Sequence, residues 1–257
     1  MPPLTRRRVE SALIKYSSGV TPVYGKKGRI GLIVPANNSV IEPEFWSVLP
    51  PDYSVHATRI LAKGDLTPEA VRRMERDTDA AMEAIAATGV DVIAYCDMVT
   101  TFIMEAQWNE SAMARFSAAT KIPCISAWTA LRDALAKLGA RRLAIGTPYP
   151  KKIHATVAPF FEARGFTVLS DATLDILSMS EVPTVDATRL GSLIKNLNLG
   201  NCDALVLLAT DLPTFTVINS LENQLGIPVL TSNQTILWRA LSELGGAAGM
   251  RTLGRLF

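Results

Sequence analysis

Three segments of this chain recur in the same order roughly a hundred residues further on. Both copies of the first segment begin with Arg, both copies of the second with Asp, and both copies of the third with Ile-Pro. The pairs are 29–35 with 142–148, 91–97 with 203–209, and 122–135 with 227–241. Two copies are too few for a solenoid. The repeat therefore predicts two similar units that face each other across a pseudo-twofold axis.

Within each copy, short apolar runs alternate with segments of helical periodicity. Residues 29–35 and 90–95 are continuous apolar runs, which are typical of buried parallel strands. Thr67-Pro-Glu-Ala is a typical helix start and predicts a helix to about residue 88. Strands are further expected at 53–60, 122–126, 142–146, 167–169, 204–208 and 229–232, and helices at 110–120, 127–138, 151–164, 184–197, 216–225 and 234–244.

This alternation predicts an α/β fold of two pseudo-symmetric lobes, each a parallel sheet flanked by helices. We expect an N-terminal extension over residues 1–28. The first lobe is expected to comprise 29–127 plus 234–257, and the second lobe 128–233. Ligands of such sheets bind outside the carboxyl ends of the strands, often between domains. The predicted active site is therefore a cleft between the lobes.

Composition excludes several classes of protein. With 257 residues, 48% hydrophobic and 19% charged, the chain can bury a core, so it is neither disordered nor fibrous. The 26 basic and 24 acidic residues leave a net charge of +2, which predicts no nucleic-acid partner. No apolar run approaches the length of a membrane span or follows the N-terminal arginines as a signal peptide would, so we expect a cytoplasmic protein without a membrane partner.

The cysteine and histidine content argues against metal centres and disulfides. Three widely spaced cysteines without a C-x-x-C pattern, and two histidines, predict neither a metal site nor a disulfide framework. Cys124 and Cys202 are expected to be structural, and His56 and His154 to be packing or surface residues. Glycine-rich phosphate-binding motifs are also missing, so no nucleotide cofactor, and no cofactor of any kind, is predicted.

Four strand-end loops should meet at the cleft, and they carry two carboxylates. These loops are 35–39, 96–101, 148–150 and 209–214, with 231–234 behind them. Asp97 ends a buried strand, where burial would raise its pKa and suit it to general acid or base catalysis. Asp211 lies two residues past Ala209, the position that corresponds to Asp97 in the second copy, so the two carboxylates could flank one substrate from opposite lobes. A helix or turn cap remains the alternative role for each.

Neutral donors in the same loops could hold a carboxylate. Side-chain amides, a phenol and backbone N–H groups can bind an anion, and stabilise an enediolate, without a full positive charge. The candidates for substrate binding are Asn37, Asn38 and Tyr149, with Thr100, Thr210 and Ser232 as weaker ones. Cys96 is a further candidate for catalysis, but strand alternation directs its side chain away from that of Asp97, so it is also interpreted as a buried, inert thiol.

The chain resembles the aspartate/glutamate racemase superfamily, within it the branch of arylmalonate decarboxylase and maleate cis-trans isomerase. The segments that carry the resemblance are 31–38, 89–95, 121–124, 141–149, 203–208 and 226–238. The resemblance implies paired α/β lobes, carboxylate binding at the asparagine and tyrosine turns, and one cysteine at the corresponding strand end of each lobe. Counting along the segments places those cysteine positions on Asp97 and Ala209, whereas a slip of one residue would place Cys96 in the first.

The sequence therefore predicts a cofactor-independent enzyme acting on a small carboxylate, of isomerase or decarboxylase type. An enolate-like intermediate is expected, with Asp97 in place of the family thiol. Two alternatives stay open: a hydrolase or hydratase in which Asp97 and Asp211 activate water, and a carboxylate-binding protein without catalysis. The oligomeric state is also open, and the apolar stretch 215–225 is a candidate for pairing between copies in a homo-oligomer.

Overall fold

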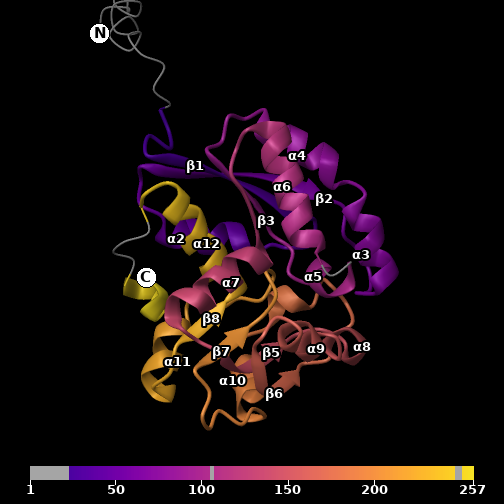
Figure 1. Cartoon of the computed structure of the whole chain (residues 1–257), viewed down its shortest axis with the longest axis vertical. Coiled ribbons are helices and arrows are strands. Elements are labelled where there is room, and N and C mark those ends of the chain that lie inside the picture. Colours follow the sequence, from indigo (N-terminus) through magenta and orange to yellow (C-terminus); the bar gives the residue numbers. More distant parts are fainter. Residues whose placement is uncertain (1–22, 105–106, 247–250) are drawn as a thin grey trace, which may run out of the picture.

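The strands of the protein form two four-stranded sheets, and neighbouring strands in both are parallel. The computed structural model describes residues 23–104, 107–246 and 251–257. The strand orders are β2-β1-β3-β4 and β6-β5-β7-β8, which are equivalent under the sequence repeat. We call each sheet with its flanking helices a lobe. Figure 1 shows the first lobe above the second, with α7 and α12 between them. The predicted architecture is confirmed.

The central strands of each sheet are the continuous apolar runs of the sequence. Every residue of β3 and β7 is buried, because helices cover both faces of these sheets. Edge strand β6 alternates between exposed and half-buried residues instead. The strands are β1 (Gly28–Pro35), β2 (Tyr53–Ile60), β3 (Val92–Tyr95), β4 (Cys124–Ser126), β5 (Arg142–Thr147), β6 (Thr167–Thr173), β7 (Ala204–Leu207) and β8 (Val229–Thr231).

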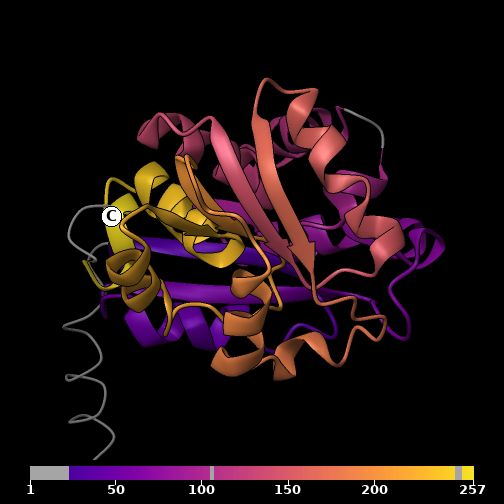
Figure 2. The ribbon, with the colours of Figure 1, turned by 90° about the horizontal axis from the view of Figure 1, so that it is seen from below.

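Helices surround the two sheets, as the two perpendicular views show (Figures 1 and 2). In the first half of the chain they are α2 (Ile41–Val48), α3 (Pro68–Glu75), α4 (Thr78–Ala86), α5 (Thr100–Ile103), α6 (Trp108–Thr120) and α7 (Ala127–Leu138). In the second half they are α8 (Lys151–His154), α9 (Val157–Glu162), α10 (Ala187–Lys195), α11 (Ile218–Leu225) and α12 (Ser232–Glu243), with the short 3-10 helices η1 (Val182–Thr184) and η2 (Arg251–Leu256).

The repeat-related helices α7 and α12 pack against each other and join the lobes. Each begins directly after a strand and carries the same start signal. Ser126 and Thr129 form a capping box at α7, and Thr231 and Gln234 form one at α12. Each box satisfies backbone N–H groups that the first helical turn leaves without partners. The local sequence thus fixes both helix starts, and their packing sets the pseudo-twofold arrangement.

The observed helices differ from prediction in places. The helix expected over 67–88 is two helices, because the backbone N–H of Arg76 bonds to Arg73 and Met74 in a tightened last turn that ends α3. The helix expected over 151–164 is also divided. Pro159 lies in the first turn of α9, where it is tolerated, whereas one long helix would place it in the interior. Helices α2 and α5 were not predicted.

Part of the predicted N-terminal extension, residues 1–22, lies outside the described residues. The lobe boundaries stay a prediction, and α12 contacts strands of both sheets, namely β3, β4 and β8. Within the described ranges, no helix has the length and apolar character needed to cross a membrane. Over the same ranges, no three histidine, cysteine, aspartate or glutamate residues cluster as metal ligands would.

Candidate active site

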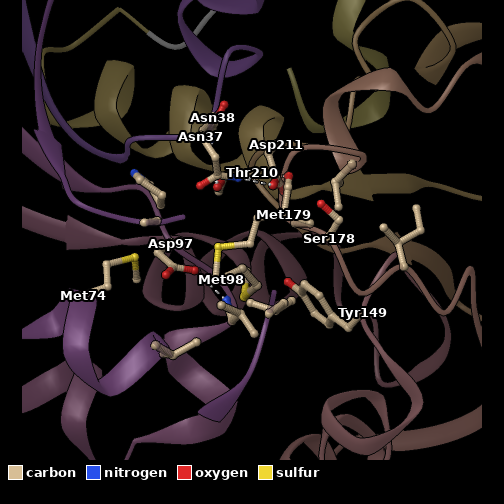
Figure 3. A pocket seen from close by; sticks show the side chains of 18 residues that line it. Asn37, Asn38, Met74, Asp97, Met98, Tyr149, Ser178, Met179, Thr210 and Asp211 are labelled. Carbon is tan, nitrogen blue, oxygen red and sulfur yellow. Dashed lines mark hydrogen bonds between the residues drawn. The ribbon is translucent and has the colours of Figure 1, made fainter. Parts of the chain in front are cut away.

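The four predicted loops meet at one pocket between the lobes (Figure 3). It encloses about 510 Å³, including the space at its opening. The loops after β1 and β3 bring residues from the first lobe, and those after β5 and β7 from the second. The described residues that line the pocket are Pro35, Asn37, Asn38, Ala62, Leu66, Val71, Met74, Asp97, Met98, Val99, Tyr149, Ile176, Ser178, Met179, Val182, Ala209, Thr210 and Asp211.

Asp97 lies in the wall of this pocket and is only 5% exposed. Its Oδ1 accepts a hydrogen bond from the backbone N–H of Val99 at 2.8 Å, and its Oδ2 accepts one from the hydroxyl of Thr100 at 2.9 Å. Burial outweighs these two bonds and raises the pKa of Asp97 to about 6. The residue therefore caps the turn that leads into α5, as one interpretation of the sequence expected, and it also presents a titratable group to the pocket; its role in catalysis stays a prediction.

Asp211 contributes a second carboxyl group from the other lobe. It follows β7, and its Oδ2 accepts a hydrogen bond from the side-chain amide of Asn37 at 3.1 Å. Burial raises the pKa of Asp211 to about 7, and the negative charge of Asp97 raises it further in the same direction. Figure 3 shows the two aspartates on different sides of the pocket. Two carboxyl groups thus share one enclosure.

The asparagine turn after β1 connects the lobes. The Asn38 amide donates to the Thr210 hydroxyl at 3.2 Å, and that hydroxyl donates to the backbone carbonyl of Cys96 at 2.8 Å. The side-chain oxygen of Asn38, Oδ1, accepts hydrogen bonds from the backbone N–H groups of Val40 and Ile41 at the start of α2. Asn38 therefore stabilises the turn before α2 and also connects the two lobes through Thr210. Its contact with substrate stays a prediction.

Tyr149 presents an unpaired donor to the pocket. The side chain is 3% exposed, and its hydroxyl has no hydrogen-bond partner among the described atoms. Burial raises the pKa of this hydroxyl well above its ordinary value, and the charges of Asp97 and Asp211 raise it further. A buried donor without a partner is costly. A ligand oxygen in the pocket would satisfy it.

Two further segments, which were not predicted to contribute to the site, close the pocket on another side. The backbone N–H of Leu66 donates to the carbonyl of Leu177 at 2.8 Å, and that of Met179 donates to Gly64 at 3.1 Å. Asp65 and Ser178 form an isolated antiparallel bridge between the same segments. We call segments 61–67 and 174–185 the clasp. It supplies apolar lining, including Leu66 and Met179.

Three predicted site residues do not line the pocket. Cys96 is fully buried, and its thiol bonds to the carbonyl of Ala94, because the chain direction that turns Asp97 toward the pocket turns Cys96 away. Burial raises the pKa of this thiol far above its ordinary value, so it is a poor nucleophile. Thr100 lies behind Asp97, and Ser232 accepts a hydrogen bond from the N–H of Ala209. Both support pocket residues instead of facing the ligand space.

The remaining cysteines and both histidines also lie outside the pocket lining. Cys124 is half-buried and Cys202 is buried, and both thiols are free. His56 bonds to the Ser54 hydroxyl, and His154 bonds to the Thr147 hydroxyl. The described lining contains neither cysteine nor lysine, arginine or histidine. The pocket is therefore acidic, without thiols and without cationic side chains among these residues.

Two further carboxylates support the site, and sequence reasoning missed both. Glu44 on α2 accepts from the backbone N–H groups of Thr214 and Phe215 at 2.6 and 2.8 Å, and from the Asn233 amide at 2.7 Å. It therefore fixes the loop after β7 from the opposite lobe. Glu75 at the end of α3 accepts from the Tyr95 hydroxyl at 2.8 Å. Each glutamate lies in a helix, and nothing in the local sequence distinguishes it from a glutamate that contacts solvent.

The family model of arylmalonate decarboxylase matches residues 30–257. The chain belongs to the arylmalonate decarboxylase family. A maleate isomerase of Geobacillus stearothermophilus is 30% identical over 85% of this chain and 92% of its own length. The solved maleate isomerase of Pseudomonas putida S16 with maleate superposes with a TM-score of 0.85 at 26% identity, covering 89% of this chain and 96% of that one.

A third relative was solved with a covalent intermediate bound to a cysteine. A maleate cis-trans isomerase of Nocardia farcinica, solved with a covalently bound succinylcysteine intermediate, superposes with a TM-score of 0.84 at 27% identity. It covers 89% of this chain and 97% of that one. A cysteine carries the intermediate in that protein. Asp97 and Ala209, the residues on which counting along the sequence places the two family cysteines, both line the pocket, and their correspondence to those cysteines stays a prediction.

Proposed function

We propose that the protein is an isomerase or lyase of the arylmalonate decarboxylase and maleate isomerase type, acting on a small carboxylate without a cofactor. Asp97 would transfer the proton that a thiol transfers in relatives. The observation that carries this proposal is the shared pocket of Asp97 and Asp211, two buried carboxyl groups with raised pKa values from opposite lobes. Titratable groups with perturbed pKa values in a cleft are typical of acid–base catalysis.

The two aspartates suit different roles. Burial raises the pKa of both residues, and the negative charge of Asp97 raises that of Asp211 further. When Asp97 is ionised and acts as a base, Asp211 is therefore favoured in its protonated form and can donate a hydrogen bond to a substrate oxygen. Separation of the pKa values of two neighbouring acids is a common way to divide the base and acid roles.

The proposed chemistry passes through an enolate-like intermediate. In a racemisation, ionised Asp97 removes the α-proton, and the electron pair of the C–H bond moves into the enediolate. Protonated Asp97 exchanges this proton with solvent, and the enediolate, after turning its other face toward Asp97, takes a proton from it on that face. In a decarboxylation, the bond to the departing CO₂ breaks, its electron pair forms the enediolate, and protonated Asp97 delivers a proton to that carbon. The Tyr149 hydroxyl and protonated Asp211 would donate hydrogen bonds to the enediolate oxygens.

The pocket lining favours a substrate with an apolar substituent and low negative charge. Apolar side chains from α3, the clasp and the loop after β3 could enclose an alkyl or aryl group; they include Leu66, Val71, Met74, Met98 and Met179. With no cation in the described lining, a dianion meets repulsion once Asp97 is ionised. We therefore expect maleate and arylmalonate to bind more weakly as the pH rises above about 6.

The experiment incubates the protein with three probe compounds in D₂O at several pH values from about 5 to about 8, and proton NMR monitors the conversion of each probe. Phenylmalonate reports decarboxylation, maleate reports double-bond isomerisation, and a single enantiomer of 2-phenylpropionate reports α-deuteration with racemisation. Conversion of at least one probe supports the proposal. Saturable binding of all three without any product would identify a binding protein, and oxygen-18 from water in a product would identify a hydratase or hydrolase.

A further inference from the structure

A line of hydrogen bonds leads from Asp97 away from the pocket to Glu75. The Thr100 hydroxyl donates to Asp97 Oδ2 at 2.9 Å, and the Tyr95 and Thr100 hydroxyls lie 3.3 Å apart. The Tyr95 hydroxyl in turn donates to Glu75 Oε2 at 2.8 Å. Each hydroxyl can give up one proton and receive another. While both end groups are ionised, each hydroxyl donates to its own carboxylate. Once Glu75 is protonated, it can donate to the tyrosine oxygen, and the Tyr95 hydroxyl can donate to Thr100, which makes the line from Glu75 to Asp97 continuous.

The two hydroxyl groups in the middle of this line are buried away from solvent, whereas Glu75 at its far end is not. Tyr95 and Thr100 are each 0% exposed, and the ring of Trp108 packs edge-on against Tyr95 with centroids 5.2 Å apart. Glu75 is half-buried and reaches solvent. Asp97, at the pocket end, is almost completely enclosed. The hydrogen bonds thus lead from an enclosed group to one that can exchange protons with water.

The two carboxyl groups at the ends ionise in the same pH range. Burial raises the pKa of Glu75 to about 7, close to the value of about 6 for Asp97. The negative charges that act on Glu75 are those of Asp97 and Asp79, and both raise its pKa. Hydrogen bonds from Tyr95 and from the Thr78 hydroxyl, the latter at 3.1 Å, lower it.

We propose that Glu75 is the solvent-side end of a proton relay to Asp97. When Glu75 is protonated and Asp97 is ionised, the carboxyl proton passes to the tyrosine oxygen. The tyrosine proton passes to the threonine oxygen, and the threonine proton passes to Asp97. One proton is gained by Asp97 and one is lost by Glu75, which takes a new proton from water. Glu75 does not line the pocket, so it is a positioning residue for protons and not a catalytic one.

The inferred relay rests on the proposed function, which requires that Asp97 be reprotonated in each catalytic cycle. Asp97 must regain a proton after giving one to a carbanion-like intermediate. While a ligand fills the pocket, the clasp and the apolar lining separate Asp97 from water on that side. The route through Tyr95 stays intact whether the pocket is filled or empty, because none of its groups other than Asp97 belongs to the described lining.

The test measures how fast Asp97 takes up a proton while the pocket is filled with 2-methyl-2-phenylpropionate at saturation, a carboxylate that has no α-proton and cannot react. Protons are released by a laser flash from a caged acid, and the carbonyl band of protonated Asp97 is followed by time-resolved infrared spectroscopy. Its band is assigned by its loss in Asp97→Asn. We expect Tyr95→Phe and Glu75→Gln each to slow the uptake at least about tenfold, a small part of the effect that acid–base groups have on rates.

A matched control separates the relay from a general disturbance around Glu75. Thr78→Val removes a hydrogen bond to the same Oε2 that does not belong to the line, and it should leave the rate unchanged. Thr100→Ser keeps the hydroxyl and should retain the native rate, whereas Thr100→Val should not. An unchanged rate in Tyr95→Phe, or equal slowing in Thr78→Val, would overturn the relay.

The outcome remains decisive if one variant does not fold. Tyr95 is fully buried, so thermal melts precede the kinetics, and the comparison of Glu75→Gln with Thr78→Val decides if Tyr95→Phe is unfolded. The infrared measurement needs no turnover. A relay that is absent while the probes still react removes only this inference, whereas normal proton uptake by Asp97 with no reaction of any probe removes the proposed function.

Discussion

Asn37 of the first lobe donates a hydrogen bond of 3.1 Å to the carboxylate of Asp211 in the second lobe. The same amide nitrogen lies 3.2 Å from the backbone carbonyl of Met179 in the clasp. One side chain therefore connects the loop after β1, the loop after β7 and the clasp. Because the hydrogen bond favours the ionised carboxylate, it lowers the pKa of Asp211 against the effect of burial. The hydrogen bond between the lobes and the protonation state of Asp211 consequently affect each other.

Removing this amide should raise the pKa of Asp211. A hydrogen bond to a charged group contributes about 1.5–3 kcal/mol, so Asn37→Ala is expected to shift the pKa upward by about one unit or more. Carbon-13 NMR titration of the aspartate carboxyl groups measures the shift. Asn223→Ala, on the exposed face of α11, is the control and should leave the titration unchanged. A downward shift in Asn37→Ala would contradict the assigned hydrogen bond.

The stability of the protein should fall as the pH rises from about 4 to about 7. Asp97, Asp211, Glu44 and Glu75 have pKa values raised to about 6, 7, 6 and 7. The folded state therefore binds more protons than the unfolded state in this range. Their contribution to stability is fully present below their unfolded values near 4 and is lost as the pH passes through their folded values.

Urea unfolding at several pH values measures this loss. One unit of pKa shift corresponds to about 1.4 kcal/mol, so the combined loss should be on the order of several kcal/mol. Asp203, whose ion pair with Arg142 lowers its pKa to about 2, acts in the opposite sense and only at lower pH. The double variant Asp97→Asn with Asp211→Asn should show a flatter profile. A native profile that rises between pH about 4 and about 7 would refute the burial of these acids.

Glu44 should matter for stability more than its place on a surface helix suggests. Glu44→Ala leaves the N–H groups of Thr214 and Phe215 and the Asn233 amide without their acceptor. Unpaired buried donors cost about 1–3 kcal/mol each, and partial access of water reduces the sum, so we expect a loss of about 2–4 kcal/mol in the free energy of unfolding. Glu162→Ala, at an exposed position of α9, should stay within about 0.5 kcal/mol of the native protein.

Tyr149 should contribute to ligand binding and not to stability. Its hydroxyl is buried without a partner, so Tyr149→Phe should leave the free energy of unfolding unchanged or increase it slightly. If the hydroxyl donates to a bound carboxylate, the same change should weaken binding by roughly tenfold or more. Calorimetric titration with 2-phenylpropionate measures the affinity, and Tyr53→Phe, outside the pocket lining, is the control. Lost stability with unchanged affinity would show that the hydroxyl is a structural group.

Much of the pocket was predictable because parallel strands deliver their carboxyl ends to one edge of a sheet. Asn37, Asn38, Asp97, Tyr149, Thr210 and Asp211 all come from strand-end loops, and all line the pocket. The internal repeat in the sequence predicted that these loops belong to two facing lobes. Residues one or three positions away, such as Cys96 and Thr100, were predicted less well, because small changes in chain direction decide which side chain faces the ligand space.

The clasp and the two supporting glutamates were not predictable from local pattern. The bridge of Asp65 with Ser178 joins irregular segments that lie far apart in sequence. Glu44 and Glu75 lie on helices, where a glutamate usually contacts solvent. Their importance comes from tertiary neighbours, namely the N–H groups after β7 and the Tyr95 hydroxyl. Only the packed structure brings these donors to them.

The proposed role of Asp97 as the acid–base group in place of the family thiol is tested most directly by Asp97→Asn. The substitution keeps the size of the side chain and one oxygen, which can still accept from Val99, and its amide NH₂ group can donate to the Thr100 hydroxyl where the second carboxylate oxygen accepted from it, but it removes the acid–base group. With whichever probe the native enzyme converts, we predict a kcat lower by about 100- to 10,000-fold, with circular dichroism and thermal melting close to native. A kcat equal to that of the native enzyme would contradict the assignment of Asp97.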